Sequence, residues 1–427
     1  MKIAIIGAGL MGRLIALSLL RESKQFSQSF EITLFDKDKK DAHNSAAYAA
    51  AGLLTPLGES LHCEANIVEM GFAAIKCWPD LLNSLDEYTI FQQAGAIMVS
   101  HEQDKGDYQR FVRHLANNYP QHSVQSLNRQ QLLALEPELG RSFNNGLFLP
   151  EEGQLGNRRL LIALRKQIEQ EAKQDQFNWH SECEITAIAA TDVGQQLSFK
   201  RLHVEQTCTQ AEGLAQGGKI QQQSFDLVID CRGTGASSAK ATNQGAPLKG
   251  LRSVRGELFQ LFAPNVHLTR PIRLMHPRYQ LYIAPKQKGF YVVGATEIES
   301  DDDAPMTVRS AMELLSAAYS VHPGFAEANI RQHVSQCRPA FDDNQPSIRV
   351  NQNLVQVNGL FRHGFLIAPI VLEQVMAVIK ELVSHQGASF QSLGKQAQYC
   401  ELSPRPYDHW LPIDFHENHS KTEEFIS

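Results

Sequence analysis

The first twelve residues constrain the fold more than any other stretch, because an apolar run there ends in three closely spaced glycines. Residues 2–6 form an apolar segment typical of a buried strand, and Gly7, Gly9 and Gly12 follow it. The first glycine permits a sharp turn, the second lets a pyrophosphate approach the backbone, and the third lets the next helix pack closely on the strand. The N-terminus of that helix directs its partial positive charge at the phosphates. The pattern predicts a dinucleotide cradle.

The residues around the glycines support that interpretation. Apolar residues at near-helical spacing follow the turn from Leu10 and Met11 onward, and residues 30–36 indicate a second strand that ends in a carboxylate. Asp36, with Lys37 beside it, takes the place of the acidic residue that binds the ribose 2′-hydroxyl. An ordinary βαβ corner with accidental glycines is the alternative. Strand, turn, helix and acidic strand end together favour the cradle.

Length, charge and cysteine usage narrow the class of protein. A chain of 427 residues is too long for one simple core and suggests two domains. The net charge of −6 gives no basic footprint for nucleic acid, and no apolar run is long enough to predict a membrane span. The first strand runs straight into the glycine turn, which leaves no segment typical of a signal peptide. The seven cysteines are dispersed without CxxC or zinc spacing, so we expect reduced thiols, no metal site and a cytoplasmic location.

The middle of the chain leaves the nucleotide pattern and returns to it. We expect an amphipathic helix over residues 65–78 that Pro79 ends, a strand over 95–99, and a departure from the pattern at about 88–148. A helix over 158–173 and a strand over 183–188 mark the return.

The second half of the chain combines β-rich segments with two more approaches to the nucleotide. Residues 189–224 are predicted to be a polar β excursion at the surface, with a Gln- and Gly-rich tip at 216–223. Residues 225–235 predict a buried parallel strand that ends in glycines, where Cys231 and Gly233 can touch a nucleotide. The expected elements after it are a β-rich block over 255–296, a helix over 308–319, a strand over 330–335, and a closing segment over 358–369 that leads into a helix to about 384.

Several separate segments match one protein family in the same order. These segments are 7–12, 49–56, 228–233, 253–257, 282–285 with 294–296, Arg338 and Pro339 with Asp343 and Pro346, and 361–369. On these residues the chain resembles the FAD-dependent amine oxidoreductases of the D-amino acid oxidase superfamily. It is most similar to the glycine oxidase branch that is associated with thiamine-thiazole synthesis.

The resemblance implies an α/β fold, α+β overall, with a doubly wound Rossmann-like FAD domain and a second, mixed-sheet substrate domain. The expected pieces of the FAD domain are residues 1–87, 151–245 (with the β excursion 189–224) and 337–387. The substrate domain is expected at 88–150 and 246–336, and residues 388–427 form a C-terminal extension.

The resemblance also implies the cofactor and the residues that hold it. In this family Asp36 would bind the adenosine ribose, residues 50–54 would line the flavin, and Gly364 would open a helix aimed at the pyrimidine end of the ring. The expected FAD-binding residues are Gly7, Gly9, Leu10, Met11, Gly12, Asp36, Lys37, Ala50, Ala51, Gly52, Leu53, Ile185, Cys231, Gly233, Arg338, Arg362, His363, Gly364, Phe365 and Leu366.

We expect this FAD to be non-covalent. Ala49 stands where some relatives attach FAD through a histidine. Cys337 lies one position from the cysteine that others use, and one position along a strand is the opposite face.

The expected catalytic residues are Arg338, Tyr282 and Arg362. By the family pattern, Arg338 makes a paired contact with a substrate carboxylate, Tyr282 adds a hydroxyl, and Arg362 lies near the flavin. Without the resemblance, the favoured interpretation of Arg338 is an interdomain salt bridge, and that of Tyr282 is a core aromatic residue on a strand. Hydride would pass from the substrate Cα to flavin N5, which is chemistry that the cofactor supplies.

Four positions depart from the pattern of the glycine oxidase branch. Leu360 lies where relatives carry a histidine, and His363 lies where they often carry an asparagine. Glu297 replaces an apolar residue and Arg232 replaces a small residue. A carboxylate at Glu297 would disfavour a nearby anion, pair with an amine, or simply be solvated. Arg232 would support the reduced flavin or pair near Asp230.

The leading hypothesis is FAD-dependent oxidation of the C–N bond of a small amine that carries a carboxylate: glycine, sarcosine or a D-amino acid. The products are an imine and, with oxygen as acceptor, hydrogen peroxide. The alternative is a flavoprotein maturation enzyme that oxidises a side chain of a partner protein, as in the biogenesis of protein-derived quinone cofactors. Two features motivate this alternative. The pocket positions are altered, and the extension 388–427, which is aromatic, acidic and His-bearing, is a candidate docking segment for a protein partner. An NAD-dependent enzyme is the third hypothesis.

Overall fold

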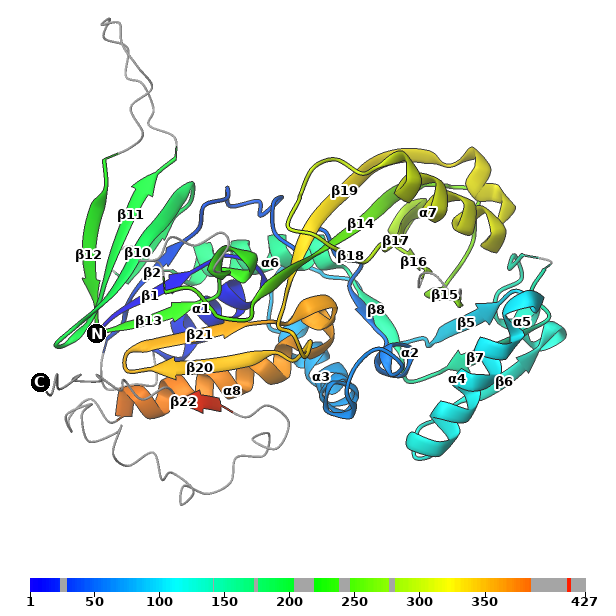
Figure 1. Ribbon diagram of the computed structural model, residues 1–427, viewed down its shortest axis with the longest axis horizontal. Helices are drawn as coiled ribbons and strands as arrows, with labels where there is room; N and C mark the ends of the chain where they lie inside the picture. The colour runs from blue at the N-terminus through cyan, green and yellow to red at the C-terminus, as the bar shows by residue number, and fades with distance from the viewer. Residues whose placement is uncertain are drawn as a thin grey trace, which may run out of the picture.

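Two large β-sheets set the architecture of the computed structural model, which describes residues 1–23, 29–140, 142–172, 176–202, 219–237, 246–275, 281–384 and 413–415. One has seven strands and the other nine. Figure 1 shows the seven-stranded sheet with α1 and α8 toward the left and the nine-stranded sheet with α4, α5 and α7 toward the right. The predicted α/β fold is confirmed.

The seven-stranded sheet is parallel except for one antiparallel pair. Its strands, in spatial order, are β22 (Ile413–Phe415), β20 (Ser347–Asn351), β21 (Leu354–Asn358), β13 (Leu227–Asp230), β1 (Lys2–Ile6), β2 (Glu31–Phe35) and β9 (Phe177–His180). Only β20 and β21 run antiparallel. The helices that share one apolar core with this sheet are α1 (Leu10–Glu22), α3 (Ala65–Asn83), α6 (Asn157–Glu171) and α8 (Gly364–Ser384).

The nine-stranded sheet is mixed. Its strands are β18 (Ile298–Glu299), β14 (Arg252–Phe262), β17 (Phe290–Gly294), β16 (Leu281–Pro285), β15 (Ile272–Met275), β5 (Ala96–Ser100), β7 (Asn145–Leu149) and β6 (Gln125–Asn128), with β19 (Asn329–Ala340) paired to β14. Only β15 and β5 run parallel. The helices near it are α4 (Lys105–Asn118), α5 (Arg129–Leu135) and α7 (Val308–Val321).

Smaller elements complete the described chain. The antiparallel strands β10 (Cys183–Thr191), β11 (Gly194–Arg201) and β12 (Gln221–Phe225) form the predicted β excursion, although most of its expected tip lies outside the described residues. A third small sheet contains β3 (Leu53–Leu54), β8 (Gly153–Leu155) and β4 (Phe91–Gln92). The short helices are α2 (Pro56–Glu59), η1 (Glu102–Asp104), η2 (Gly233–Ala236), η3 (Gln287–Gly289), η4 (Pro323–Glu327) and η5 (Phe361–His363).

The division of the chain into two domains stays a proposal, which the membership of the sheets supports. Strands from 1–87, 151–245 and 337–387, together with β22 from the extension 388–427, build the seven-stranded sheet, and strands from 88–150 and 246–336 build the nine-stranded one. The proposed boundary at 336/337 falls inside β19, which stays paired to β14 through Ala340. Because this strand is continuous, it carries Arg338 on the second sheet.

The prediction that Pro79 ends a helix is wrong. Helix α3 continues through Pro79 to Asn83. A proline inside a helix removes one backbone hydrogen bond. Here Trp78 and Leu82 are both buried on the inner face of α3. The buried apolar stripe thus extends past the proline and outweighs its local cost.

The strand over 183–188 exists, but it does not belong to the nucleotide sheet. It is the start of β10, in the antiparallel excursion. The parallel neighbour of β2 is instead β9, which is only four residues long and includes Asn178 and His180. Such a short, partly polar segment gives little periodic signal. Of the C-terminal extension, only residues 413–415 are described, as the edge strand β22.

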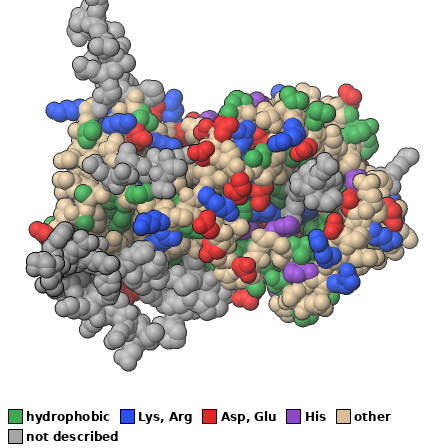
Figure 2. Space-filling model, in the orientation of Figure 1, with side chains coloured by type: hydrophobic (Ala, Val, Ile, Leu, Met, Phe, Trp, Pro, Cys, Tyr) green, Lys and Arg blue, Asp and Glu red, His purple; other side chains and the backbone are tan. Residues whose placement is uncertain are grey.

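The surface carries mixed charge. On the face shown in Figure 2, acidic and basic side chains are interspersed among uncharged ones. Within the described ranges, the helices are all too short or too polar to cross a bilayer.

Trp78 joins α3 to the beginning of α8. Its indole Nε1 donates to the Phe365 carbonyl at 3.0 Å, and the side chain is fully buried. We expect Trp78→Phe to lower the free energy of unfolding by about 2 kcal/mol, because it leaves that buried carbonyl without its donor and opens a small cavity. Denaturant titration measures the loss. Trp179→Phe is the matched control, since the indole nitrogen of Trp179 has no partner among the described residues; equal losses in the two variants would contradict the prediction.

Candidate active site

A cavity of about 1110 Å³ lies where four parallel strands end. Gly7 follows β1, Asp36 follows β2, Cys231 follows β13, and Asn358 is the last residue of β21, and all four line the cavity. In doubly wound sheets a ligand binds at this carboxyl edge. The other wall comes from the nine-stranded sheet, which contributes Tyr282 and others.

The three glycines of the opening turn have different tasks. Gly7 adopts φ +95°, a conformation that favours glycine. A Cβ at Gly9 would meet no atom within 4 Å and would project into the cavity, whereas a Cβ at Gly12 would collide with the Gly7 carbonyl. Gly9 thus keeps space open for a ligand and Gly12 permits close packing of α1.

Asp36 and Arg13 fix the turn from behind. Asp36 accepts hydrogen bonds from the backbone N–H groups of Ala8 and Asp38. Arg13 is buried and donates to three carbonyls, those of Ala8 at 2.7 Å, Leu161 at 2.6 Å and Lys40 at 2.9 Å. Burial lowers the pKa of Arg13 to about 10 and raises the pKa of Asp36. These contacts tie the cradle to α6 and to the loop after β2.

The small-residue segment 46–53 lines the cavity, and a lysine holds it in place. Lys286 Nζ donates to the Ala51 carbonyl at 2.8 Å, the Gln154 side chain at 2.9 Å and the Leu155 carbonyl at 3.1 Å. These acceptors match the three donors of an ammonium group. Burial lowers the pKa of Lys286 to about 7. The wall of small residues is therefore tied to the second sheet.

His363 also lines the cavity, directly before the N-terminus of α8. Its side chain is 1% exposed, and neither ring nitrogen has a hydrogen-bond partner among the described residues. Burial lowers the pKa of His363 to about 4, so the ring is neutral at pH 7. A buried polar group without a partner is costly and points to a ligand that satisfies it.

Arg338 is available for an anion. Its Nη1 donates to the Thr296 carbonyl at 3.2 Å, and it forms no ion pair within the part of the chain that the structure describes. Gly256 lies against the guanidinium, where any side chain would collide with it. Tyr282 lines the same part of the cavity. Burial lowers the pKa of Arg338, against the opposing effects of Tyr282 and Glu297.

Two other arginines of the cavity are already paired with carboxylates. Arg273 Nη1 lies 2.6 Å from Glu59 Oε1, and Arg362 Nε lies 2.7 Å from Glu59 Oε2. Arg362 also donates to Glu297 Oε2 at 2.7 Å. Burial raises the pKa of Glu59, but Arg273 and Arg362 outweigh it and hold that pKa well below its ordinary value. The four side chains form a charge row, Arg273–Glu59–Arg362–Glu297, with no net charge.

The structure brings the predicted site residues together with two exceptions. Gly12 lies behind the turn, as its packing role requires. Ile185 lies in β10 and packs with the cluster around Phe35, away from the cavity. The predicted residues that line the cavity are Gly7, Gly9, Leu10, Met11, Asp36, Lys37, Ala50, Ala51, Gly52, Leu53, Cys231, Gly233, Tyr282, Arg338, Arg362, His363, Gly364, Phe365 and Leu366.

Sequence reasoning missed Glu59, Arg273 and Lys286. Glu59 is the last residue of the short helix α2, which follows the small-residue segment, so a carboxylate soon after a cavity-lining stretch was a possible signal. Arg273 lies in β15 and Lys286 directly follows β16, and their neighbours in sequence carry no motif that indicates a site.

The contacts of Arg232 and Cys337 bear on two questions that the sequence leaves open. Arg232 pairs with Asp230, through Nε at 2.8 Å and Nη2 at 2.7 Å. Cys337 Sγ donates to the carbonyls of Ser300 and Asp302. The thiol thus has partners on a protein loop, which supports non-covalent FAD.

A glycine cradle on a doubly wound sheet, faced by a second sheet that presents an arginine, defines a class of dinucleotide-dependent oxidoreductases. Comparison with known proteins identifies the family. The model of the DAO family, described as FAD dependent oxidoreductase, matches residues 2–374. A protein of Rhizobium etli with the provisional name thiamine biosynthesis oxidoreductase ThiO is 32% identical over 91% of this chain and 98% of its own length.

Solved structures agree on the fold. Glycine oxidase of Geobacillus kaustophilus superposes with a TM-score of 0.71 at 20% identity, over 89% of this chain and 95% of that one. Iminodiacetate oxidase of Chelativorans sp. BNC1 gives 0.71 at 18% identity, over 97% and 100%. The chain belongs to the DAO family of FAD-dependent oxidoreductases. This family assignment sets the NAD-dependent hypothesis aside.

The residues of the cavity fit FAD. The space in front of Gly9 suits a pyrophosphate, the small-residue wall suits a flat ring, and the unpartnered nitrogens of His363 lie beside the N-terminus of α8. FAD bound there would extend from Asp36 toward Arg338.

We expect Gly9→Val to abolish retention of FAD, because its side chain would occupy the space reserved for the pyrophosphate. Gly106→Val is the control, since a Cβ at Gly106 also meets no atom within 4 Å but lies in α4. Cofactor content after gel filtration is measured from flavin absorbance. A fully yellow Gly9→Val protein would contradict the cradle.

His363 makes the stability of the FAD-free protein depend on pH. Its folded pKa of about 4 lies below its ordinary value of 6.5. Between these pH values His363 binds a proton in the unfolded chain but not in the folded chain, so the free energy of unfolding falls as the pH drops from 6.5 toward 4. We expect His363→Asn to remove roughly 2–3 kcal/mol of that fall between pH 7 and pH 4.5. Denaturant titration at both pH values measures the free energy of unfolding, and a substitution of the exposed His43, His43→Asn, is the control. An equal loss of stability between pH 7 and pH 4.5 in wild type and His363→Asn would refute the prediction.

Proposed function

We propose that this enzyme oxidises the C–N bond of a small amine that carries a carboxylate, with glycine, sarcosine and D-amino acids as candidates. The observation that supports this most is the state of the arginines. Arg273 and Arg362 are paired with carboxylates, whereas Arg338 makes only a neutral contact among the described residues and lies next to Tyr282. Arg338 differs from Arg309, which also lines the cavity, because Arg309 is exposed whereas Arg338 is half-buried. A half-buried guanidinium without a counter-ion among the described residues suits an anionic substrate group.

The residues of this chain would bind and orient the substrate. Arg338 would hold its carboxylate through two parallel N–H···O bonds, with the Tyr282 hydroxyl beside it. This anchor would aim the Cα–H bond toward the flavin side of the cavity, a positioning effect that accounts for much of the rate in such reactions. FAD, when bound, supplies the two-electron acceptor. With that acceptor present, the Cα–H bond of the neutral amine would break with transfer of a hydride to the acceptor, the nitrogen lone pair would form the C=N bond, and the product would be an imine. Oxygen as final acceptor would give hydrogen peroxide.

The names of relatives agree with this chemistry. Glycine oxidase and iminodiacetate oxidase are both oxidases of amines that carry a carboxylate, and the Rhizobium etli relative is named for thiamine biosynthesis. The alternative, oxidation of a partner protein, is not favoured by any of them. The described part of the C-terminal extension, residues 413–415, pairs with the protein's own β20.

A cytoplasmic location is part of the proposal. It is supported by the dispersed cysteines, of which the five that the structure describes form no disulfide. The decisive experiment on the activity is an anaerobic screen in which glycine, sarcosine and D-amino acids are mixed with the FAD-loaded enzyme. Bleaching of the flavin by at least one of them supports the proposal, and a flavin that no amine reduces refutes it.

We expect Arg338→Lys to reduce the second-order rate constant for flavin reduction by the substrate by roughly 100-fold, because an ammonium group cannot reproduce the paired hydrogen bonds of a guanidinium. FAD content should be unchanged. Arg331→Lys on the same strand is the control, since the Arg331 guanidinium lies over the Phe262 ring rather than in the cavity. Stopped-flow reduction measures the three proteins, and equal rates for Arg338→Lys and wild type would remove Arg338 from the site.

A further inference from the structure

Glu297 offers the cavity a fixed carboxylate oxygen. Its Oε2 accepts from Arg362 at 2.7 Å, and its Oε1 has no partner within the described parts of the chain. The side chain is 47% exposed and lines the same cavity as Arg338 and Tyr282. One oxygen is therefore anchored and the other is accessible to a ligand.

The position of this carboxylate is set by the charge row Arg273–Glu59–Arg362–Glu297. Glu59 is mostly buried and holds both Arg273 and Arg362. Arg362, fixed in this way, in turn fixes Glu297. A residue at the end of such a row loses little further side-chain entropy when it meets a ligand.

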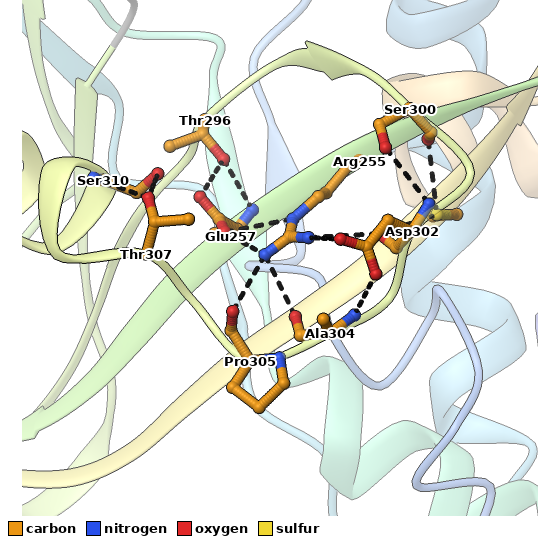
Figure 3. A network of polar contacts seen from close by, with 10 residues as sticks. Arg255, Glu257, Thr296, Ser300, Asp302, Ala304, Pro305, Thr307 and Ser310 are labelled. Atoms are coloured by element: carbon orange, nitrogen blue, oxygen red, sulfur yellow. Dashed lines mark hydrogen bonds and ion pairs between the residues drawn. The ribbon is translucent and has the colours of Figure 1, made fainter.

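The backbone on both sides of Glu297 is held by a second network, shown in Figure 3. The Thr296 hydroxyl donates to Glu257 Oε2 at 3.1 Å, and Arg255 bonds Glu257 at 2.6 Å. The same guanidinium reaches Asp302 Oδ2 at 2.9 Å. Both Arg255 and Glu257 are buried, so the segment that carries Glu297 is clamped before and after it.

One peptide group, between Thr296 and Glu297, connects Arg338 to Glu297. Arg338 Nη1 donates to the Thr296 carbonyl, which belongs to the peptide that leads into Glu297. In an α-amino acid the carboxylate and the ammonium are attached to the same carbon. An amino acid whose carboxylate is held by Arg338 would therefore carry its nitrogen within reach of this part of the cavity wall.

We propose that Glu297 recognises the ammonium group of the substrate through its free oxygen, and so selects zwitterionic amines over other small carboxylates. This inference rests on the proposed function and deepens it. It decides between the alternatives for Glu297 in favour of the amine. An apolar residue at this position would leave the ammonium without a counter-charge, so the mode of amine recognition here would differ from that of the glycine oxidase branch.

The inference predicts a pH effect as well as an affinity effect. The nitrogen must lose its proton before its lone pair can form the C=N bond. A neighbouring carboxylate favours the charged form and raises the pKa of the bound ammonium. Flavin reduction at saturating glycine should then rise with pH, with a midpoint that the charge of Glu297 sets.

The test compares FAD-loaded wild type, Glu297→Gln and Glu299→Gln. Glu299 lies two residues further along, is 67% exposed and pairs with Arg252, and it does not line the cavity, so it is a matched control. Anaerobic stopped-flow gives the rate of flavin reduction by glycine from pH 6 to pH 10. Perturbation of the flavin spectrum gives the dissociation constant of glycolate, which has the carboxylate but no amine.

For Glu297→Gln we expect the apparent affinity for glycine to fall about 10-fold or more, as for loss of a charged hydrogen bond. The midpoint of the pH profile should move down by about one unit. Binding of glycolate should stay the same or tighten, and Glu299→Gln should behave as wild type. An unchanged midpoint, or an equal loss of glycine and glycolate binding, overturns the role of Glu297 while leaving the proposed function intact. If no amine reduces the wild-type flavin, the proposed function itself fails, and this inference fails with it.

Discussion

The parallel pairing of β13 between β1 and β21 is the constraint on which the rest of the site depends. Ile229 lies between Ile5 and Val355 in this ladder, and all three are fully buried. Burial of such runs on both faces makes the register strongly specified. Because the strands are parallel, the turns that follow them meet at one edge. Residues more than 200 positions apart in the chain thereby line one cavity.

Electrostatics then divides the arginines of the cavity into two groups. A buried ion pair is stable only when both partners keep their geometry. Glu59 satisfies Arg273 and Arg362 at once, and these two arginines hold its pKa low. Arg338 lies outside this row and stays available for an anion. Whether an arginine of this cavity is held in an ion pair or is available for an anion thus depends on where the carboxylates lie.

Sequence patterns predicted the elements well where an apolar run was long and failed where tertiary packing decided. The strands at 2–6 and 227–230 and helix α8 follow directly from apolar runs and glycines. Pro79 did not end α3, because the buried stripe continued beyond it. Strand β9 was missed because it is short and partly polar, and Ile185 was consequently placed in the wrong sheet. In each case long-range contacts outweighed a local rule.

The sequence by itself determined the dinucleotide cradle, the α/β fold and, through the ordered family segments, FAD as cofactor. The cradle follows from glycine stereochemistry and apolar periodicity, which are local, whereas the fold and the cofactor follow from the resemblance of the ordered segments to one family. Only the tertiary structure decided which charges face one another: that Glu59 holds Arg273 and Arg362, that Glu297 keeps one free oxygen, and that His363 lacks a partner among the described residues. These pairings join elements from distant parts of the chain, and electrostatic interactions depend on distance in space rather than on separation in sequence.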